Sequence, residues 1–351
     1  MTLPRGLNGK HSYIKMFSTL IDFIIRSPDG TELLASMDSG HMTVLNPNNE
    51  LECTGKIKGH MSGFNDFDWY PWMNSSLKGS DLFLTSSKDL PIQLWSSSEG
   101  KVVCSWIAKD HLDQVANCLS VSFSPDGQKI VSGGQDKIWI FDTNRPGANS
   151  VCEFQTIPRK KSKSGLRGLI SCLNFRYDDT GVFAAGSFKG SVGVYDSRTL
   201  SDRNSSSFCL FEAHKNGVSQ VKFLNDGWSI LTAGRRDKTL KKWDLRMIQV
   251  NDPISEYIVN EPTRTNQRLY FDTTSIGKLF TGSAESLLEF EISSGELLKA
   301  ISLGNTVSSV SIDRSEKFAY STGCRKFQID DDSESEDHET IINTISIQTI
   351  K

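Results

Sequence analysis

The stretch AHKNGVSQVKFLNDGWSILTAGRRDKTLKKWD, residues 213–244, decides the fold of this chain. It opens with Ala213-His214 and continues with alternating apolar residues as far as a turn at Asn225-Asp226-Gly227. A second apolar run follows the turn, then comes Asp237, and the stretch ends at Lys242-Trp243-Asp244. Alternation of apolar and polar residues, broken by Asn, Asp and Gly, predicts antiparallel β-strands joined by tight turns.

The same order of signals recurs elsewhere in the chain. An upstream copy has Gly59-His60, then Asp89, and closes at Leu94-Trp95. Another copy carries the turn Ser124-Pro125-Asp126-Gly127 and closes at Ile140-Phe141-Asp142. A repeat of about 40 residues with Gly-His early and Trp-Asp late is typical of WD40 repeats. Such repeats build the four-stranded blades of a β-propeller, each repeat supplying the first three strands of a blade and the fourth strand leading into the next blade.

The length of the chain fits a single ring of about seven repeats. We therefore predict an all-β fold, a seven-bladed WD40 β-propeller over residues 11–351, with residues 1–10 as a short N-terminal tail. His11–Phe17 alternates and is expected to be the fourth strand of the last blade, where it would hide two sheet edges. Ile341–Ile350 is expected to be the third strand of that blade. The acidic run 330–339 between them cannot bury enough apolar surface and is expected to be a disordered excursion.

The other blades are placed by their turns and apolar runs. They are expected to begin near Thr19 and near residues 62, 117, 169, 217 and 268, with the last blade starting at Val307. The second blade carries an insertion from Pro71 to Ser80.

Composition narrows the function further. The net charge of −3 implies no nucleic-acid or membrane partner for the molecule as a whole, so any electrostatic site must be a local patch. The seven cysteines include no C-x-x-C pair, which predicts free thiols in a reducing compartment. The apolar run Leu20–Ile25 is interrupted by Asp22 and is too short to span a membrane. A soluble, intracellular protein is expected.

Two groups of residues resemble a catalytic Ser-His-Asp set. One is His60, Thr85, Asp89 and Trp95, and the other is His214, Asp237 and Trp243. In WD40 repeats such residues form a buried hydrogen-bond chain that holds the turns, so a structural role is expected. Ala233 stands where the hydroxyl residue of the second group is expected, which predicts an incomplete chain there.

No phosphate-binding loop, dinucleotide fingerprint or zinc-binding spacing occurs in the sequence. We therefore expect no enzymatic activity, no cofactor, no metal and no small-molecule substrate.

Basic residues gather at one rim of the expected ring. We name the four strands of each blade a to d from the axis outward. In a propeller, the loops from d to the next a and from b to c emerge on one face, and the a–b and c–d loops emerge on the other. Several basic or aromatic residues fall in the d–a and b–c loops. The expected RNA-binding residues are Arg159, Lys160, Lys161, Lys163, Arg167, Phe188, Lys189, Arg235, Arg236, Arg264 and Arg268. Clustered basic residues neutralise phosphates, and arginine with an aromatic ring suits single-stranded RNA loops. The alternative for the lysine-rich loop is a solvated or nuclear-localisation tract.

The opposite face carries Tyr70, Trp72 and Met73 in the insertion of the second blade. Two aromatic residues and a methionine on a loop are expected to form a protein-binding knob. The alternative is a loop that folds back on the outer sheet of the blade.

Several of these segments together resemble the telomerase Cajal body protein family. Asp68–Met73 and Thr265–Asp272 carry the resemblance, because they are not general features of WD40 chains. Further matches are Pro91–Trp95, His111–Asp113, Arg145–Gly147, Leu169–Cys172, Gly193–Tyr195 and Trp243–Arg246. The resemblance covers nearly the whole predicted propeller.

The resemblance implies a factor that binds small nuclear or telomerase-type RNA and assists ribonucleoprotein assembly, maturation or localisation. Its implied partners are a small non-coding RNA and the proteins of its ribonucleoprotein, and the protein is expected to be monomeric with no membrane partner. The implied compartment is the nucleus, as nucleoplasm, a Cajal-body-like body or nucleolus, with the cytoplasm as a further location. A protein–protein interaction scaffold with no direct RNA contact is the competing hypothesis, because WD40 folds often serve that role.

Overall fold

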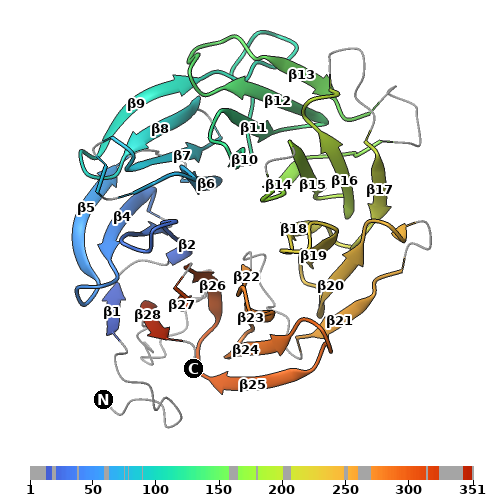
Figure 1. The fold of residues 1–351 in the computed structure, drawn as a ribbon. Helices are drawn as coiled ribbons and strands as arrows, with labels where there is room; N and C mark the ends of the chain where they lie inside the picture. Colours follow the sequence, from blue (N-terminus) through green and yellow to red (C-terminus); the bar gives the residue numbers. More distant parts are fainter. Residues whose placement is uncertain are drawn as a thin grey trace, which may run out of the picture.

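The computed structural model describes residues 13–17, 21–37, 39–58, 63–74, 76–77, 79–88, 90–157, 165–178, 181–200, 207–248, 252–259, 270–313, 315–323 and 343–349. These residues form seven four-stranded antiparallel sheets. The sheets stand side by side around a central axis as the blades of a propeller, and the chain passes around the ring from blue to red (Figure 1). The predicted seven-bladed, all-β fold is confirmed.

The first four blades each use consecutive strands, ordered from the axis outward. Blade 1 consists of β2 (Ile21–Arg26), β3 (Leu33–Met37), β4 (His41–Asn46) and β5 (Glu52–Lys58). Blade 2 consists of β6 (Asp66–Trp69), β7 (Leu82–Ser86), β8 (Ile92–Ser96) and β9 (Lys101–Trp106). Blade 3 consists of β10 (Ser120–Phe123), β11 (Lys129–Gly133), β12 (Lys137–Asp142) and β13 (Cys152–Gln155). Blade 4 consists of β14 (Ile170–Phe175), β15 (Val182–Ser187), β16 (Ser191–Asp196) and β17 (Cys209–Glu212).

The remaining blades complete the ring. Blade 5 consists of β18 (Val218–Phe223), β19 (Ser229–Gly234), β20 (Thr239–Asp244) and β21 (Ser255–Ile258). Blade 6 consists of β22 (Phe271–Thr273), β23 (Lys278–Gly282), β24 (Ser286–Glu291) and β25 (Leu297–Ser302). Blade 7 consists of β26 (Val307–Ile312), β27 (Lys317–Thr322), β28 (Asn343–Thr349) and β1 (Tyr13–Phe17). Among the described residues, no helix is long and apolar enough to cross a membrane.

Blade 7 joins the two ends of the described chain. Strand β1 pairs antiparallel with β28, from Tyr13 opposite Ile347 to Phe17 opposite Asn343. The N-terminal strand therefore covers the outer edge of the sheet that the last strand of the chain would otherwise leave open. The run 330–339 lies outside the described residues.

Short turns between the first two strands of a blade follow from their sequence. In Ser124-Pro125-Asp126-Gly127, the proline presets the first turn dihedral and Gly127 adopts a φ of +69°. The N–H of Gly127 donates to the carbonyl of Ser124 over 2.8 Å, and the N–H of Lys129 donates to the Ser124 hydroxyl over 2.9 Å. The turn thus satisfies its own polar groups at the rim.

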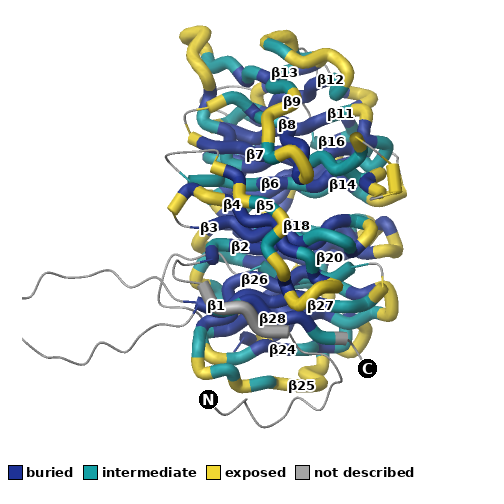
Figure 2. The backbone as a smooth tube through the Cα atoms, turned by 90° about the vertical axis from the view of Figure 1, so that its left-hand side faces the viewer, coloured by how far each residue is buried: buried dark blue, intermediate teal, exposed yellow. Residues whose placement is uncertain are grey.

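The hydrophobic core lies between neighbouring blades. Aromatic rings bridge blades 1 and 2, where Phe23 stacks on Phe67 with ring centroids 4.1 Å apart. Buried residues follow the strands through the body of the ring, and exposed residues lie at the loops and along outer strands such as β25 (Figure 2). Each blade therefore buries both of its sheet faces against its neighbours.

Side chains of the innermost strands also tie each blade to the next by hydrogen bonds. Asp68 accepts from the N–H of Phe123 over 2.9 Å, and Asn174 accepts from the N–H of Phe223 over 2.9 Å. Asp272 accepts from the N–H of Ile312 over 2.7 Å. These carboxylates and amides surround a narrow axial channel of about 280 Å³.

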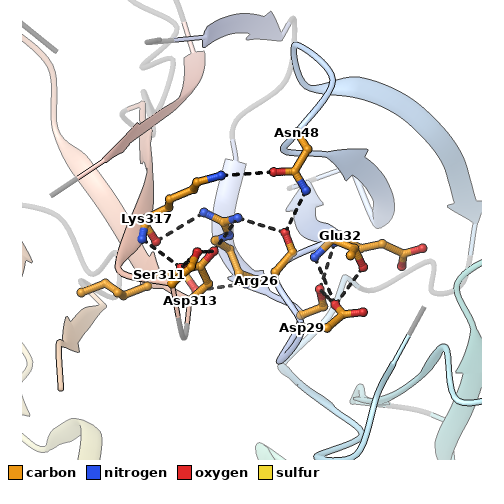
Figure 3. A network of polar contacts seen from close by, with 12 residues as sticks. Arg26, Asp29, Glu32, Asn48, Ser311, Asp313 and Lys317 are labelled. Atoms are coloured by element: carbon orange, nitrogen blue, oxygen red, sulfur yellow. Dashed lines mark hydrogen bonds and ion pairs between the residues drawn. The ribbon is translucent and has the colours of Figure 1, made fainter. Parts of the chain in front are cut away.

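The seam between blades 7 and 1 contains a buried ion pair. Arg26 Nη2 lies 2.8 Å from Asp313 Oδ2, and both side chains are almost fully buried. The same guanidinium donates to the carbonyls of Gly30 and Lys317, at 3.0 and 3.3 Å (Figure 3). Burial lowers the pKa of Arg26, and the Asp313 carboxylate partly offsets this effect. The pair thus links the end of β2 to the turn that follows β26.

Candidate nucleic-acid interface

A hollow of about 380 Å³ lies on the face that carries the b–c and d–a loops. It is lined by Phe188 and Lys189 from blade 4, Lys215 and Asn216 from the loop to blade 5, and Arg235 and Arg236 from blade 5. No acidic side chain occurs in this lining among the described residues. Four cationic side chains and one aromatic ring therefore converge at the boundary between two blades.

Glycine residues allow these loops to approach one another closely. A Cβ on Gly217 would lie 2.7 Å from the carbonyl oxygen of Phe188, and Gly217 has a φ of +98°. The Gly217 carbonyl also accepts a hydrogen bond from the N–H of Arg235 over 2.9 Å. Gly190 accepts from the N–H groups of Ala213 and His214, at 2.8 and 3.0 Å. The backbone thus fixes the spacing between the Phe188 and Arg235 turns.

The cationic side chains differ in their surroundings. The guanidinium carbon of Arg235 lies 4.9 Å from the centroid of the Phe188 ring, a cation–π contact. Lys189, Lys215 and Arg236 are exposed. Arg236 adopts a φ of +50°, in the left-handed region that non-glycine residues rarely occupy. The turn therefore presents its arginine side chains from a tightly constrained backbone.

A buried hydrogen-bond chain supports this turn from below. His214 Nδ1 lies 2.7 Å from Asp237 Oδ2, and His214 Nε2 lies 2.8 Å from the hydroxyl of Thr232. The Trp243 indole N–H donates to the same hydroxyl over 3.0 Å. The prediction of an incomplete chain at Ala233 was wrong, because Thr232, one residue earlier, faces the histidine and supplies the hydroxyl.

The carboxylate of Asp237 ends the chain at the rim. Its partial burial would by itself raise its pKa, but the hydrogen bond and charge of His214 and the N–H of Thr239 together hold the pKa below its ordinary value. Thr232 is fully buried, and its oxygen contacts both His214 and Trp243, so the hydroxyl cannot reach a substrate. The arrangement is therefore structural.

The corresponding set in blade 2 is described only in part. The Trp95 indole N–H donates to Thr85 Oγ1 over 3.0 Å in the buried interior. His60 and Asp89 lie outside the described residues. Blade 2 thus shares the tryptophan–hydroxyl contact with blade 5.

The structure brings together some of the predicted RNA-binding residues. Phe188, Lys189, Arg235 and Arg236 line one hollow, and Arg167 lies half-buried before β14. The remaining residues of that prediction lie outside the described part of the chain: Arg159, Lys160, Lys161, Lys163, Arg264 and Arg268. Lys215 and Asn216 also line the hollow but are not among the predicted RNA-binding residues, although their place between His214 and Gly217 in a d–a loop could have indicated them.

The predicted knob on the opposite face requires a correction. Met73 is only 4 % exposed and packs in the core with Phe67 and Trp95. Tyr70 is half-buried and makes an edge contact with Phe123, with ring centroids 5.5 Å apart. Trp72, in contrast, is 64 % exposed. The loop folds back on the blade through Tyr70 and Met73, and it offers a single ring to solvent.

Comparison with known families agrees with this geometry. The profile of the WD domain, G-beta repeat, matches residues 100–142 and 205–244. The chain contains WD40 repeats. The second match contains the His214–Thr232–Trp243 chain together with Arg235 and Arg236.

Individual proteins match a larger part of the chain than the repeat profile does. The chain is 28 % identical to telomerase Cajal body protein 1 of Bos taurus over 81 % of its length, and 29 % identical to the Homo sapiens protein over 81 %. It is 29 % identical to the Drosophila melanogaster homologue over 71 %. These alignments cover 52 %, 52 % and 46 % of the relatives, so the chain spans about half the length of the curated proteins it matches. The resemblance to the telomerase Cajal body proteins is confirmed.

Proposed function

We propose that this propeller binds small non-coding RNA through the basic hollow at the boundary of blades 4 and 5. Cations from three loops meet there beside the Phe188 ring, and the lining has no carboxylate among the described residues. Phosphates bind such a surface by releasing counterions, and a base stacks on an aromatic or guanidinium plane. This convergence of charge and ring is the observation that carries the proposal.

The proposed role is non-enzymatic assistance to ribonucleoprotein assembly, maturation or localisation in the nucleus. The names of the relatives place them with telomerase and the Cajal body, which supports this assignment. Lys160 and Arg264, outside the described part of the chain, stay predicted RNA-binding residues.

The test compares two double variants with the same change in charge. Lys189→Glu with Lys215→Glu reverses two exposed cations in the hollow, and Lys101→Glu with Lys299→Glu reverses two exposed cations on outer strands. RNA recovered by crosslinking from cells should fall steeply for the first variant and stay near wild type for the second. Equal melting temperatures would show that both variants fold.

The competing function is a protein–protein scaffold. It predicts that the hollow variant recovers as much RNA as wild type, or that RNA reaches the complex only through a partner. Binding of the purified proteins to a labelled single-stranded RNA of mixed sequence separates these cases, because no partner is then present. Unchanged affinity of the hollow variant in that assay would contradict the proposal.

A further inference from the structure

A second hollow lies at the opposite mouth of the axial channel, on the face of the a–b turns. Its volume is about 560 Å³, and its lining includes Pro28, Pro71, Trp72, Pro125 and Tyr177. The residues come from the innermost strands and a–b turns of the first four blades, with further contributions from blades 5 and 7. This concave, partly apolar surface is distinct from the basic hollow, which lies on the other face.

Two aromatic side chains that line this hollow are exposed to solvent, although hydrogen bonds hold them in place. The side chains of Trp72 and Tyr177 are 64 % and 58 % exposed. Trp72 is held between Tyr70 and Met73, whose backbone groups close a turn with a 3.0 Å hydrogen bond. The Tyr177 hydroxyl donates to the carbonyl of Asn225 in blade 5. Exposed large aromatic side chains on a concave surface are typical of protein interaction sites.

The described a–b turns around this mouth carry mostly acidic side chains. Among the described residues of the a–b turns, acidic side chains occur in every blade except the sixth, whereas Arg176 is the single basic residue. The acidic residues include Asp29, Asp126, Asp226 and Glu316. The two cations of the hollow itself, Arg26 and Lys222, are each paired with an aspartate. A polyanion such as RNA is therefore repelled here, and a cationic partner is favoured.

A guanidinium group of the protein itself, that of Arg176, is already held at the edge of this face. The guanidinium carbon of Arg176 lies 5.6 Å from the ring centroid of Trp228, which is 49 % exposed. Arg176 Nε also lies 2.8 Å from Asp178 Oδ1. An arginine side chain thus lies between an exposed ring and a carboxylate at the edge of the same face.

We propose that the Trp72–Tyr177 hollow binds an arginine-containing peptide segment of a protein partner. The guanidinium group would lie on the exposed rings, and the acidic turns would compensate its charge. Arginine is preferred to lysine because its planar, weakly hydrated group stacks on aromatic rings, whereas an ammonium group remains strongly hydrated. This site does not depend on the proposed RNA interface.

The test measures binding of labelled peptides to the full chain by fluorescence anisotropy. A peptide of alternating arginine and glycine should bind more tightly than the matching lysine–glycine peptide, and a proline-rich neutral peptide should not bind. Trp72→Ala and Tyr177→Ala should each weaken the arginine peptide about five- to thirtyfold, as removal of a desolvated cation–π interaction of about 1–2 kcal/mol implies. Phe208→Ala provides the matched control, since Phe208 is 60 % exposed but lies outside the hollow.

Peptide binding and RNA binding can be tested independently, because the two hollows lie on opposite faces of the propeller. The Lys189→Glu, Lys215→Glu variant should bind the arginine peptide as wild type does, even if it loses RNA. Equal affinity for the arginine and lysine peptides would overturn the proposal, and so would an equal loss of affinity in the Phe208→Ala variant. Binding of the proline-rich peptide alone would also overturn it.

Discussion

Arg235 and Phe188 belong to different blades, yet the guanidinium carbon of Arg235 lies 4.9 Å from the centroid of the Phe188 ring. Gly217 lies directly against the backbone of Phe188, where a side chain would not fit. The turn that carries Phe188 can therefore lie close to the turn that carries Arg235. A ring covered by a guanidinium group forms a platform with both charge and a flat surface.

Replacing Phe188 by leucine or Arg235 by lysine should reduce discrimination between RNA sequences. Leucine keeps the apolar volume but removes the stacking surface, and lysine keeps the charge but removes the planar fork. Each change should cost about 1–3 kcal/mol of binding to a preferred RNA, if the base stacks there. Competition binding with RNAs of different sequence measures the effect, and equal losses for every sequence would argue against base contact.

Replacing Lys189 and Lys215 by alanine should instead weaken all RNAs to a similar extent. Each exposed lysine that neutralises a phosphate releases counterions, so the slope of log affinity against log salt should become shallower by about 0.7 for each phosphate that is no longer neutralised. Titrations at several salt concentrations provide the slope. Lys101 and Lys299, exposed on outer strands, are the control positions. An unchanged slope in the variant without Lys189 and Lys215 would show that these two lysines do not contact phosphates of the RNA.

The Thr232 hydroxyl should be required for stability rather than for RNA binding. Thr232→Val keeps the shape but leaves Trp243 Nε1 and His214 Nε2 without their partner, which should cost about 1–3 kcal/mol of unfolding free energy. Thr232→Ser keeps the hydroxyl and should cost less. Urea denaturation measures both variants, and comparable losses in the two would indicate packing rather than hydrogen bonding as the cause.

Asp68 should make the folded protein less stable as the pH rises from about 4 to about 6. Burial raises the pKa of its carboxyl from 3.8 to about 6, against the opposing hydrogen bonds from Phe123, Ser122 and Trp69. In this window the folded state retains a proton that the unfolded state has released. The contribution is therefore fully present below the unfolded pKa and is lost as the pH rises through the folded pKa.

The Asp68→Asn variant should lack this loss. The amide oxygen can still accept from Phe123, as Asn174 does from Phe223 at the corresponding place in blade 4. The difference in unfolding free energy between variant and wild type should therefore shift by up to about 3 kcal/mol between pH 4 and pH 7 in favour of the variant. Urea denaturation across this range measures it, and parallel pH profiles would contradict the assignment.

The Arg26–Asp313 pair should be sensitive to loss of one partner. Asp313→Ala leaves a buried guanidinium group without its carboxylate, which should cost about 3–5 kcal/mol and open the seam between blades 7 and 1. Arg198→Ala breaks the exposed Arg198–Asp196 pair and should cost at most about 1 kcal/mol. Thermal unfolding compares the two, and similar small losses would show that other contacts between the two blades hold the seam, such as the hydrogen bonds from the N–H groups of Ile24 and Arg26 to Ser309 and Ser311.

The repeat, the number of blades and the turns could all be predicted from the amino-acid sequence. The signals are local: alternating apolar residues, Ser-Pro-Asp-Gly turns and Trp-Asp endings. Each depends on residues close together in the sequence, so it can be interpreted without the tertiary structure. The basic rim could also be predicted in outline, because blade topology dictates which loops share a face.

Tertiary structure alone decided the finer assignments. Thr232 rather than position 233 faces His214, because a shift of one residue in a strand turns a side chain to the other face of the sheet. Met73 is buried while Trp72 is exposed, because the insertion folds back on blade 2. The pairing of Arg26 with Asp313, and of Arg235 with Phe188, depends on the distance between blades. That distance is set by packing across the whole ring, which local sequence patterns do not encode.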